Sequence, residues 1–364
     1  MTITASSAIK KLLLLVLIFA GLYFAKDFLM PLVIGALLAT LYLPMCRWLE
    51  EKKTPRFVAV FLCLLSILLL VAGVGALLGW QIAGLLEDAD KIKQKALEAF
   101  FNIQQYIFTH MGLPAKKQME ILKDQQSGMG NLLGSAVAST GYVLTSSLLM
   151  LVYFFLLVYY RSHIKKFILK LAAPEQQQET ETILLAATRV SQQYLVGLAK
   201  MIVCLWIMYG IGFSIAGVKN ALFFAVLCGL LEIIPFVGNI TGTSITLLVA
   251  AAQGGSTPML LGIAGTYGLV QFIQGWVLEP IIVGPQVKIN PLATIVALVL
   301  GELIWGIPGI ILAIPVTAVL KIICDHVTPL KPYGFLIGEI EEEQNKPGWS
   351  QRVLQWLKNK FKRS

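Results

Sequence analysis

The stretch Gly229-Leu-Leu-Glu-Ile-Ile-Pro-Phe-Val-Gly238 places a carboxylate, a proline and a glycine inside a long apolar run. In hydrocarbon, an ionisable group and an interrupted helix are each tolerated only where protein or a water-filled cavity receives them. If the surrounding chain spans a membrane, Glu232, Pro235 and Gly238 therefore do not lie against lipid as ordinary helix residues.

The composition of the whole chain indicates an integral membrane protein. Hydrophobic residues make up 57% of the 364 residues and charged residues 13%, whereas globular proteins average roughly 45–50% and about 25%. The apolar runs are scattered along the chain, which excludes a soluble enzyme with one anchor. The formal net charge is +9, but the basic residues flank apolar runs, as the positive-inside rule requires. No basic-aromatic nucleic-acid motif occurs, so no nucleic acid partner is expected.

The apolar runs predict an all-α, polytopic membrane protein of about eight transmembrane helices. These runs cover residues 9–24, 28–45, 57–80, 132–160, 195–216, 221–252, 259–283 and 291–323. The sixth is interrupted at Pro235 and Gly238, and the eighth at Gly306-Ile-Pro308-Gly309, so two helices are expected to be broken. An amphipathic, mixed-charge segment follows the third run and predicts a helical extracytoplasmic insert. A role in assembly or occlusion and a solvated connector both remain open for it.

Four segments follow from this pattern. They are N-terminal membrane helices at 1–83, the amphipathic insert at 84–131, a membrane transport core at 132–338 and a cytoplasmic amphipathic tail at 339–364. The basic flanks predict that both termini lie in the cytoplasm. The last helix, Trp349 to Phe361, has one apolar and one basic face, which favours binding to anionic membrane lipid over docking to a partner protein.

Catalytic and metal-binding motifs are missing from the sequence. There is no nucleotide-phosphate loop, no H-E-x-x-H zinc motif and no G-x-S-x-G nucleophile elbow. The three histidines are far apart, and the five cysteines form no C-x-x-C pair. The chain is therefore not expected to be an enzyme or to hold a metal or cofactor.

Polar residues concentrate in the second half of the apolar sequence. Glu232, Glu279 and Glu302 each would cost roughly 2.5–3.5 kcal/mol at the centre of a membrane helix. They could form a proton, cation or solute site, or they could be helix-end carboxylates bonded to backbone N–H groups freed by a break. Gln271 and Gln274 share one helix face. They could line a path or form interhelical hydrogen bonds.

Both helix breaks place a proline close to a glycine. Secondary transporters build solute sites from such interrupted helices, although a proline kink that helps packing is the alternative. We therefore expect a solute or ion site between the sixth region, the eighth region and the helix from Gln271 to Glu279. Its candidate residues are Glu232, Pro235, Phe236, Gly238, Asn239, Gln271, Gln274, Glu279, Glu302, Gly306, Pro308 and Gly309.

Three linked blocks resemble the autoinducer-2 exporter (AI-2E) family. The first is Glu232-Ile-Ile-Pro-Phe-Val-Gly238, and the second is Glu279-Pro280-Ile-Ile-Val-Gly284 followed by Asn290-Pro291. The third runs from Gly301 through Trp305-Gly306-Ile-Pro-Gly309 to Pro315. The order and spacing of the blocks agree with the family over nearly the whole chain. Asn239 departs from the pattern, because proline is often expected there.

The resemblance implies a multispanning permease of the bacterial inner membrane that forms homo-oligomers. The family is named for export of a furanone-type quorum-sensing signal, and other members resemble sodium/proton antiporters. We therefore expect a secondary transporter of a small solute, with Glu232 as the coupling or coordinating carboxylate. A sodium/proton antiporter, which would move H⁺ or Na⁺, is the alternative. A non-transporting membrane scaffold is the third.

Overall fold

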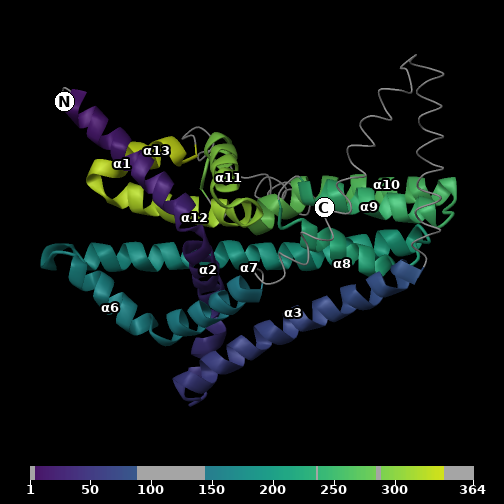
Figure 1. The fold of residues 1–364 in the computed structure, drawn as a ribbon, viewed down its shortest axis with the longest axis horizontal. Coiled ribbons are helices and arrows are strands. Elements are labelled where there is room, and N and C mark those ends of the chain that lie inside the picture. The colour runs from purple at the N-terminus through teal and green to yellow at the C-terminus, as the bar shows by residue number, and fades with distance from the viewer. Residues whose placement is uncertain (1–4, 88–143, 235–236, 284–287, 340–364) are drawn as a thin grey trace, which may run out of the picture. The chain divides into compact units, whose positions relative to one another are not determined.

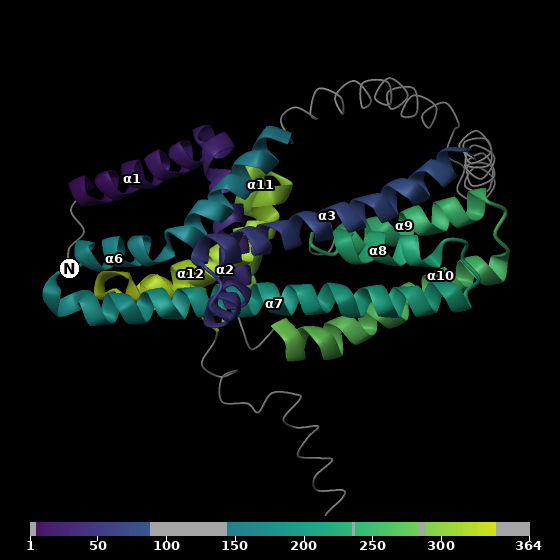
Figure 2. The same cartoon turned by 90° about the horizontal axis from the view of Figure 1, so that it is seen from below.

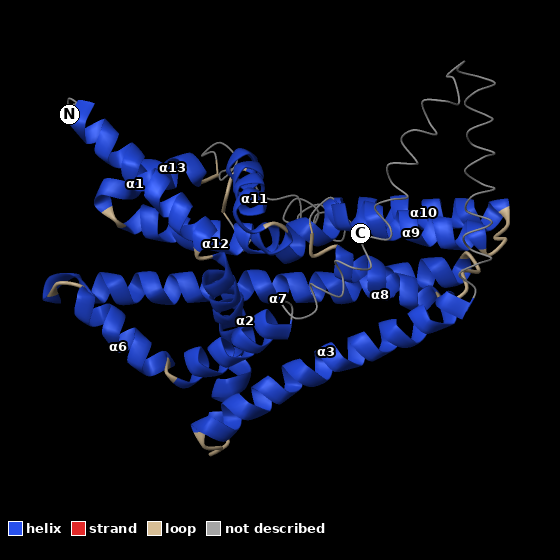
Figure 3. Cartoon of the chain, viewed as in Figure 1, coloured by secondary structure: helices blue, strands red, loops and turns tan. Residues whose placement is uncertain are grey.

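The computed structural model describes residues 5–87, 144–234, 237–283 and 288–339, which are coloured in Figure 1. Every regular element in these ranges is helical, apart from one isolated antiparallel bridge between Ile289 and Gly338 (Figure 3). The all-α prediction is confirmed. The helices are α1 (Ala5–Phe24), α2 (Lys26–Glu51), α3 (Arg56–Glu87), an unlabelled helix (Leu144–Tyr159), α6 (Arg161–Leu171), α7 (Gln177–Ile215), α8 (Ala221–Leu231), α9 (Val237–Ala252), α10 (Thr257–Ile273), the π-helix η2 (Gln274–Val283), α11 (Pro291–Trp305), α12 (Ile307–His326) and α13 (Lys331–Ile337).

Several of these helices are long and apolar enough to cross a membrane. Within the described ranges, five helical segments meet this condition, and the bent pair Leu144–Tyr159 and α6 would be a sixth. A polytopic helical membrane protein is confirmed, while the number eight stays a prediction. The predicted insert at 84–131 and tail at 339–364 lie almost entirely outside the described residues.

The chain divides into two compact units, and each is described by itself. Unit 1 comprises residues 1–67, 149–201 and 272–364, and unit 2 comprises residues 68–148 and 202–271. The helix break at Pro235 belongs to unit 2, whereas the break at Gly306 belongs to unit 1. The helix breaks therefore have to be understood one unit at a time.

The core of unit 1 forms where α2, α3 and the helix Leu144–Tyr159 pack together. Cys46, Val60 and Phe154 are fully buried in it. A side chain at Gly35 of α2 would lie 3.0 Å from the carbonyl oxygen of Met150, so the two backbones are in close contact. Such small residues at interfaces are the usual means by which membrane helices approach one another.

In unit 1, α11 and α12 form an antiparallel hairpin with a one-residue turn at Gly306. Its backbone has φ 64° and ψ −142°, a region that is essentially restricted to glycine. The turn brings Gly301 and Gly309 so close that a Cβ on either would collide with the backbone of the other. The indole N–H of Trp305 donates to the carbonyl oxygen of Leu22 in α1, at 2.9 Å. The predicted break at Gly306 is thus confirmed, but it reverses the chain instead of kinking one crossing helix.

In unit 2, α8 and α9 form a second antiparallel hairpin, and both lie side by side in Figure 1. A Cβ at Gly238 would overlap the carbonyl oxygen of Leu231, and one at Gly242 would lie 3.0 Å from the Cα of Cys228. At 11 residues, α8 is about 16 Å long, well short of the roughly 30 Å hydrocarbon core. The break between α8 and α9 is therefore also a reversal, where a single broken crossing was expected.

The start of α11 is held to the end of α13 by one side chain, Asn290. Its Oδ1 accepts a hydrogen bond from the backbone N–H of Ala293 at 2.8 Å and so caps α11. Its Nδ2 donates to the carbonyl oxygens of Leu336 at 2.6 Å and Gly338 at 2.9 Å. Asn290 thereby satisfies groups at two chain segments that lie far apart in sequence.

The glycine contact in the α11–α12 hairpin predicts a specific loss of stability. Gly309→Ala should destabilise the protein by about 1–3 kcal/mol, because the new methyl group meets the Gly301 carbonyl. Gly268→Ala in α10 is the matched control, since a Cβ there meets nothing within 4 Å. Thermal unfolding in detergent measures both, and equal melting temperatures for the two variants would contradict the close contact.

The three hydrogen bonds of the Asn290 side chain predict a stepwise loss of stability in two variants. Asn290→Ser keeps a cap acceptor but loses two donations, at about 1 kcal/mol each. Asn290→Ala loses the cap as well, which typically costs about 1 kcal/mol more. The melting temperature should therefore fall from wild type to serine to alanine. A serine variant as unstable as the alanine variant would show that the cap contributes nothing.

Candidate functional site

A polar stripe runs along one face of α9 in unit 2. Asn239, Thr243 and Thr246 are 4%, 5% and 0% exposed. They stand four and three residues apart, so they share one helix face. The polar residues on other faces of α9, Thr241 and Ser244, are exposed. The stripe therefore points into the unit instead of away from it.

The end of α8 packs against this stripe. The Sγ of Cys228 lies 3.8 Å from the Oγ1 of Thr246, whose hydroxyl in turn donates to the carbonyl oxygen of Gly242 at 2.8 Å. Glu232 follows α8 directly as its C-cap and is only 9% exposed. The missing side chain of Gly242 makes this approach of α8 to α9 possible.

Helices α7 and α10 supply the other polar groups. Tyr209 of α7 is fully buried, and the side-chain amide of Gln271 in α10 donates to its hydroxyl oxygen at 3.3 Å. Thr243 lies beside this tyrosine, and Glu232 is close enough to Tyr209 and Cys228 for electrostatic interaction. We call these residues of unit 2 the Glu232 cluster: Tyr209, Cys228, Glu232, Asn239, Thr243, Thr246 and Gln271.

Two oxygens of the Glu232 cluster can still accept a hydrogen bond or coordinate a cation. The Oδ1 of Asn239 and the Oγ1 of Thr243 are buried, and neither has a hydrogen-bond partner of good geometry among the described residues. A buried polar atom without a partner costs about 1–3 kcal/mol, so it usually meets a water, an ion or a ligand. The cluster thus has the chemistry to hold a small polar molecule or a cation through oxygen atoms.

The backbone around the first break does not depend on the Glu232 side chain at the positions described. The N–H groups of Glu232, Ile233, Ile234 and Gly238 each donate to a backbone carbonyl oxygen, at 2.9–3.2 Å. These four groups therefore need no carboxylate to satisfy them. The observation weighs against the interpretation of Glu232 as a helix-end carboxylate that serves only freed N–H groups.

The structure brings together three of the twelve predicted site residues within unit 2. Glu232, Asn239 and Gln271 belong to the Glu232 cluster, and Gly238 allows the α8–α9 reversal. Pro235 and Phe236 lie outside the described residues. The remaining six residues belong to unit 1, so a single site shared by both breaks stays a prediction.

In unit 1, Gln274 and Glu279 meet within the π-helix η2. Gln274 is 5% exposed and opens this ten-residue helix, whereas Glu279 is exposed. Hydrogen bonds in a π-helix join residues five apart, so positions 274 and 279 lie one above the other. The amide of Gln274 is within hydrogen-bonding reach of the Glu279 carboxyl group. Such helices are rare and occur frequently at functional sites.

The four other candidates of unit 1 lie at the α11–α12 turn. Glu302 is exposed near the end of α11. Gly306 supplies the turn conformation, Pro308 stands in the first turn of α12, and Gly309 makes the backbone contact. The last three thus have an evident role in shaping the hairpin.

The sequence reasoning missed four members of the Glu232 cluster. The sequence pattern does not single out Tyr209, Thr243 or Thr246, and Cys228 enters it only as one of five cysteines that form no C-x-x-C pair. The threonines had a readable signal, because with Asn239 they repeat at helical spacing inside an apolar run. Tyr209 had none, since its contact with Gln271 joins residues 62 apart in sequence.

Among the described residues, no group of three or more His, Cys, Asp or Glu side chains could hold a metal ion.

Comparison with known proteins places the chain among membrane transport proteins. Residues 12–328 match the description "AI-2E family transporter". Three similar proteins each bear the name "Putative transport protein". YueF of Bacillus subtilis is 26% identical over 82% of this chain and 84% of its own, and YhhT of Escherichia coli K12 is 21% identical over 95% and 98%. YrrI of B. subtilis is 35% identical, over 35% of this chain and 36% of its own. The match over most of the chain shows that it belongs to the AI-2E transporter family.

Proposed function

We propose that the protein is a secondary transporter that moves a small polar solute across the bacterial inner membrane, and that the Glu232 cluster binds this solute. The observation that carries the proposal is a buried polar cluster at an interrupted apolar helix pair, with two buried oxygens that have no hydrogen-bond partner among the described residues. Transporters place their sites at such interruptions. Family membership supports the transport role.

The geometry suggests how the cluster would recognise its solute. Glu232 would accept hydrogen bonds from hydroxyl groups, and Asn239 and Thr243 would add further acceptors. Tyr209 and Gln271 would contribute further polar groups, and their side chains are joined by the hydrogen bond from Gln271 Nε2 to the Tyr209 hydroxyl oxygen at 3.3 Å. A compact solute rich in hydroxyl groups, such as an autoinducer-2-like furanone, matches this set. Both termini would lie in the cytoplasm, and the protein would work as a homo-oligomer in the lipid membrane.

A second candidate function, sodium/proton antiport, rests on the same oxygens. A carboxylate, an amide oxygen and a hydroxyl oxygen are hard ligands of the kind that alkali cations prefer. In that case Glu232 would exchange a proton for the cation.

The transport proposal is tested in proteoliposomes with the full-length protein. Glu232→Gln should lower the rate of solute or ion movement about tenfold or more, because it replaces charge-assisted hydrogen bonds of roughly 1.5–3 kcal/mol. Thr243→Val, which removes one of the two oxygens without a hydrogen-bond partner at nearly constant volume, should lower the rate as well. Glu179→Gln at the exposed start of α7 is the matched control and should transport like wild type.

The two substrates are distinguished by separate measurements on the same vesicles. A labelled furanone signal reports solute export, and a pH-sensitive dye reports proton release when sodium is added. If the Glu232→Gln variant is folded, as judged by its melting temperature, and its transport rates are unchanged, the proposed role of Glu232 in binding the solute or ion is wrong. A protein that moves neither probe would support the scaffold alternative.

A further inference from the structure

A basic cavity lies in unit 1, and none of the residues assigned to transport line it. The helix Leu144–Tyr159 bends by 72° into α6, and α6 lies beside the first turns of α7 (Figure 2). Against these helices and α2, the structure has a cavity of about 410 Å³. Arg47, Arg161 and Lys165 line it together with apolar side chains that include Leu157 and Ile168.

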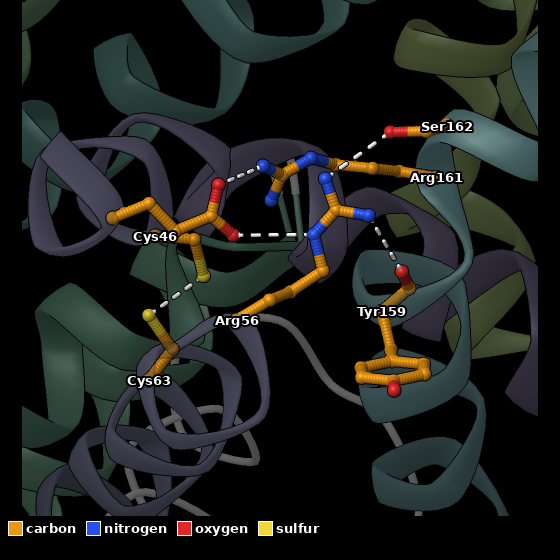
Figure 4. A network of polar contacts seen from close by, with 7 residues as sticks. Cys46, Arg56, Cys63, Tyr159, Arg161 and Ser162 are labelled. Atoms are coloured by element: carbon orange, nitrogen blue, oxygen red, sulfur yellow. Dashed lines mark hydrogen bonds and ion pairs between the residues drawn. The ribbon is translucent and has the colours of Figure 1, made fainter. Parts of the chain in front are cut away.

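Arg161 and the neighbouring Arg56 share one carboxylate, and Figure 4 shows the two arginine side chains close together. Glu50 pairs with Arg161 through Oε2 and with the Nε of Arg56 through Oε1, the latter at 3.5 Å. The other nitrogens of Arg56 donate to the carbonyl oxygen of Tyr159 at 3.4 Å and to the hydroxyl of Ser162 at 3.2 Å. Each nitrogen of Arg56 therefore has one acceptor nearby, and for Nε that acceptor is the second carboxylate oxygen of Glu50.

The positive charge at the cavity exceeds the negative charge. Lys165 pairs with Glu181 at 2.5 Å, and Glu50 is shared by two arginines. In the part of the chain that the structure describes, Arg47 has no ion-pair partner. The three lining cations, Arg47, Arg161 and Lys165, and the neighbouring Arg56 carry four positive charges against the two carboxylates of Glu50 and Glu181, which leaves an excess of two.

One donor at this cavity is buried without an acceptor. The Nη1 of Arg161 has no hydrogen-bond partner among the described residues. A hydrogen bond to a charged group is stronger than a neutral one, and leaving such a donor unpaired in the interior is correspondingly costly. An anionic oxygen from outside the chain would satisfy it.

We propose that the phosphate of an anionic membrane phospholipid occupies this cavity. The phosphate would accept from Arg161 Nη1 and lie near Arg47, while an acyl chain would follow the apolar side at Leu157 and Ile168. A free phosphate ion has no apolar part that could pack against these apolar side chains. Basic pockets between membrane helices on the cytoplasmic side are suited to anionic headgroups, and the basic flanks of this region predict that side.

The experiment is a native mass spectrometry titration of the full-length protein in detergent. The probes are phosphatidylglycerol, phosphatidylcholine with the same acyl chains, and inorganic phosphate. The variants are Arg47→Gln and Arg161→Gln, and the control is Lys170→Gln. Lys170 is exposed on α6 and does not line the cavity, and its replacement changes the charge equally. Because Arg47 has no ion-pair partner among the described residues, its replacement should leave the fold intact.

The proposal predicts that phosphatidylglycerol binds several-fold more tightly than phosphatidylcholine. Arg47→Gln should weaken phosphatidylglycerol binding about fivefold, Arg161→Gln should weaken it further, and Lys170→Gln should leave it within about twofold of wild type. Three results would overturn the proposal. They are equal binding of the two lipids, equal losses in Arg47→Gln and Lys170→Gln, and binding of inorganic phosphate as tight as that of the lipid.

Discussion

The close backbone contact between α8 and α9 is the constraint on which the Glu232 cluster depends. Because Gly238 and Gly242 lack side chains, the chain can reverse after Leu231 and bring α9 against α8. If the helix continued in one direction, Asn239, Thr243 and Thr246 would have no α8 surface to face. In apolar surroundings, polar side chains need partners within the protein. The reversal is therefore what turns three polar residues into one face of the candidate site.

The same physical solution occurs in unit 1, with a different consequence. Gly301 and Gly309 touch across the α11–α12 turn, and Gly306 supplies a backbone conformation that other residues rarely adopt. No carboxylate is buried beside that contact in the described part of the unit, since Glu302 is exposed. The two hairpins thus share their packing, whereas only the one in unit 2 combines it with a buried polar cluster. A helix break by itself does not identify a site.

Much of the architecture could be predicted from the sequence, because hydrophobic runs and helix breakers are local signals. The helical class, the positions of both breaks and the unusual status of Glu232 followed from Pro235, Gly238 and Gly306 in their apolar surroundings. The direction of the chain after each break could not be predicted. A proline or glycine ends a helix, but the contact that decides between a kink and a reversal lies on the facing backbone.

In the candidate site, too, some residues could be predicted from local sequence patterns and others could not. Asn239, Thr243 and Thr246 form a stripe that helical spacing makes visible, whereas the contact of Gln271 with Tyr209 depends on the packing of α10 against α7. The π-helix at Gln274 also escaped prediction, since the sequence there resembles an ordinary apolar helix until Pro280. Local patterns therefore indicate which residues are unusual, and tertiary packing decides which of them meet.

The reversal of α8 into α9 can be measured directly by disulfide formation. The protein would retain Cys228, carry Thr246→Cys, and have its other four cysteines replaced. The account predicts a bond between positions 228 and 246 under mild oxidation, because Cys228 Sγ lies 3.8 Å from Thr246 Oγ1. The control Leu248→Cys, at a side chain that is 64% exposed, should not form it. In one continuous helix the two positions would be about 27 Å apart. Absence of the bond in folded protein, as read by peptide mass spectrometry, would contradict the hairpin and the site built on it.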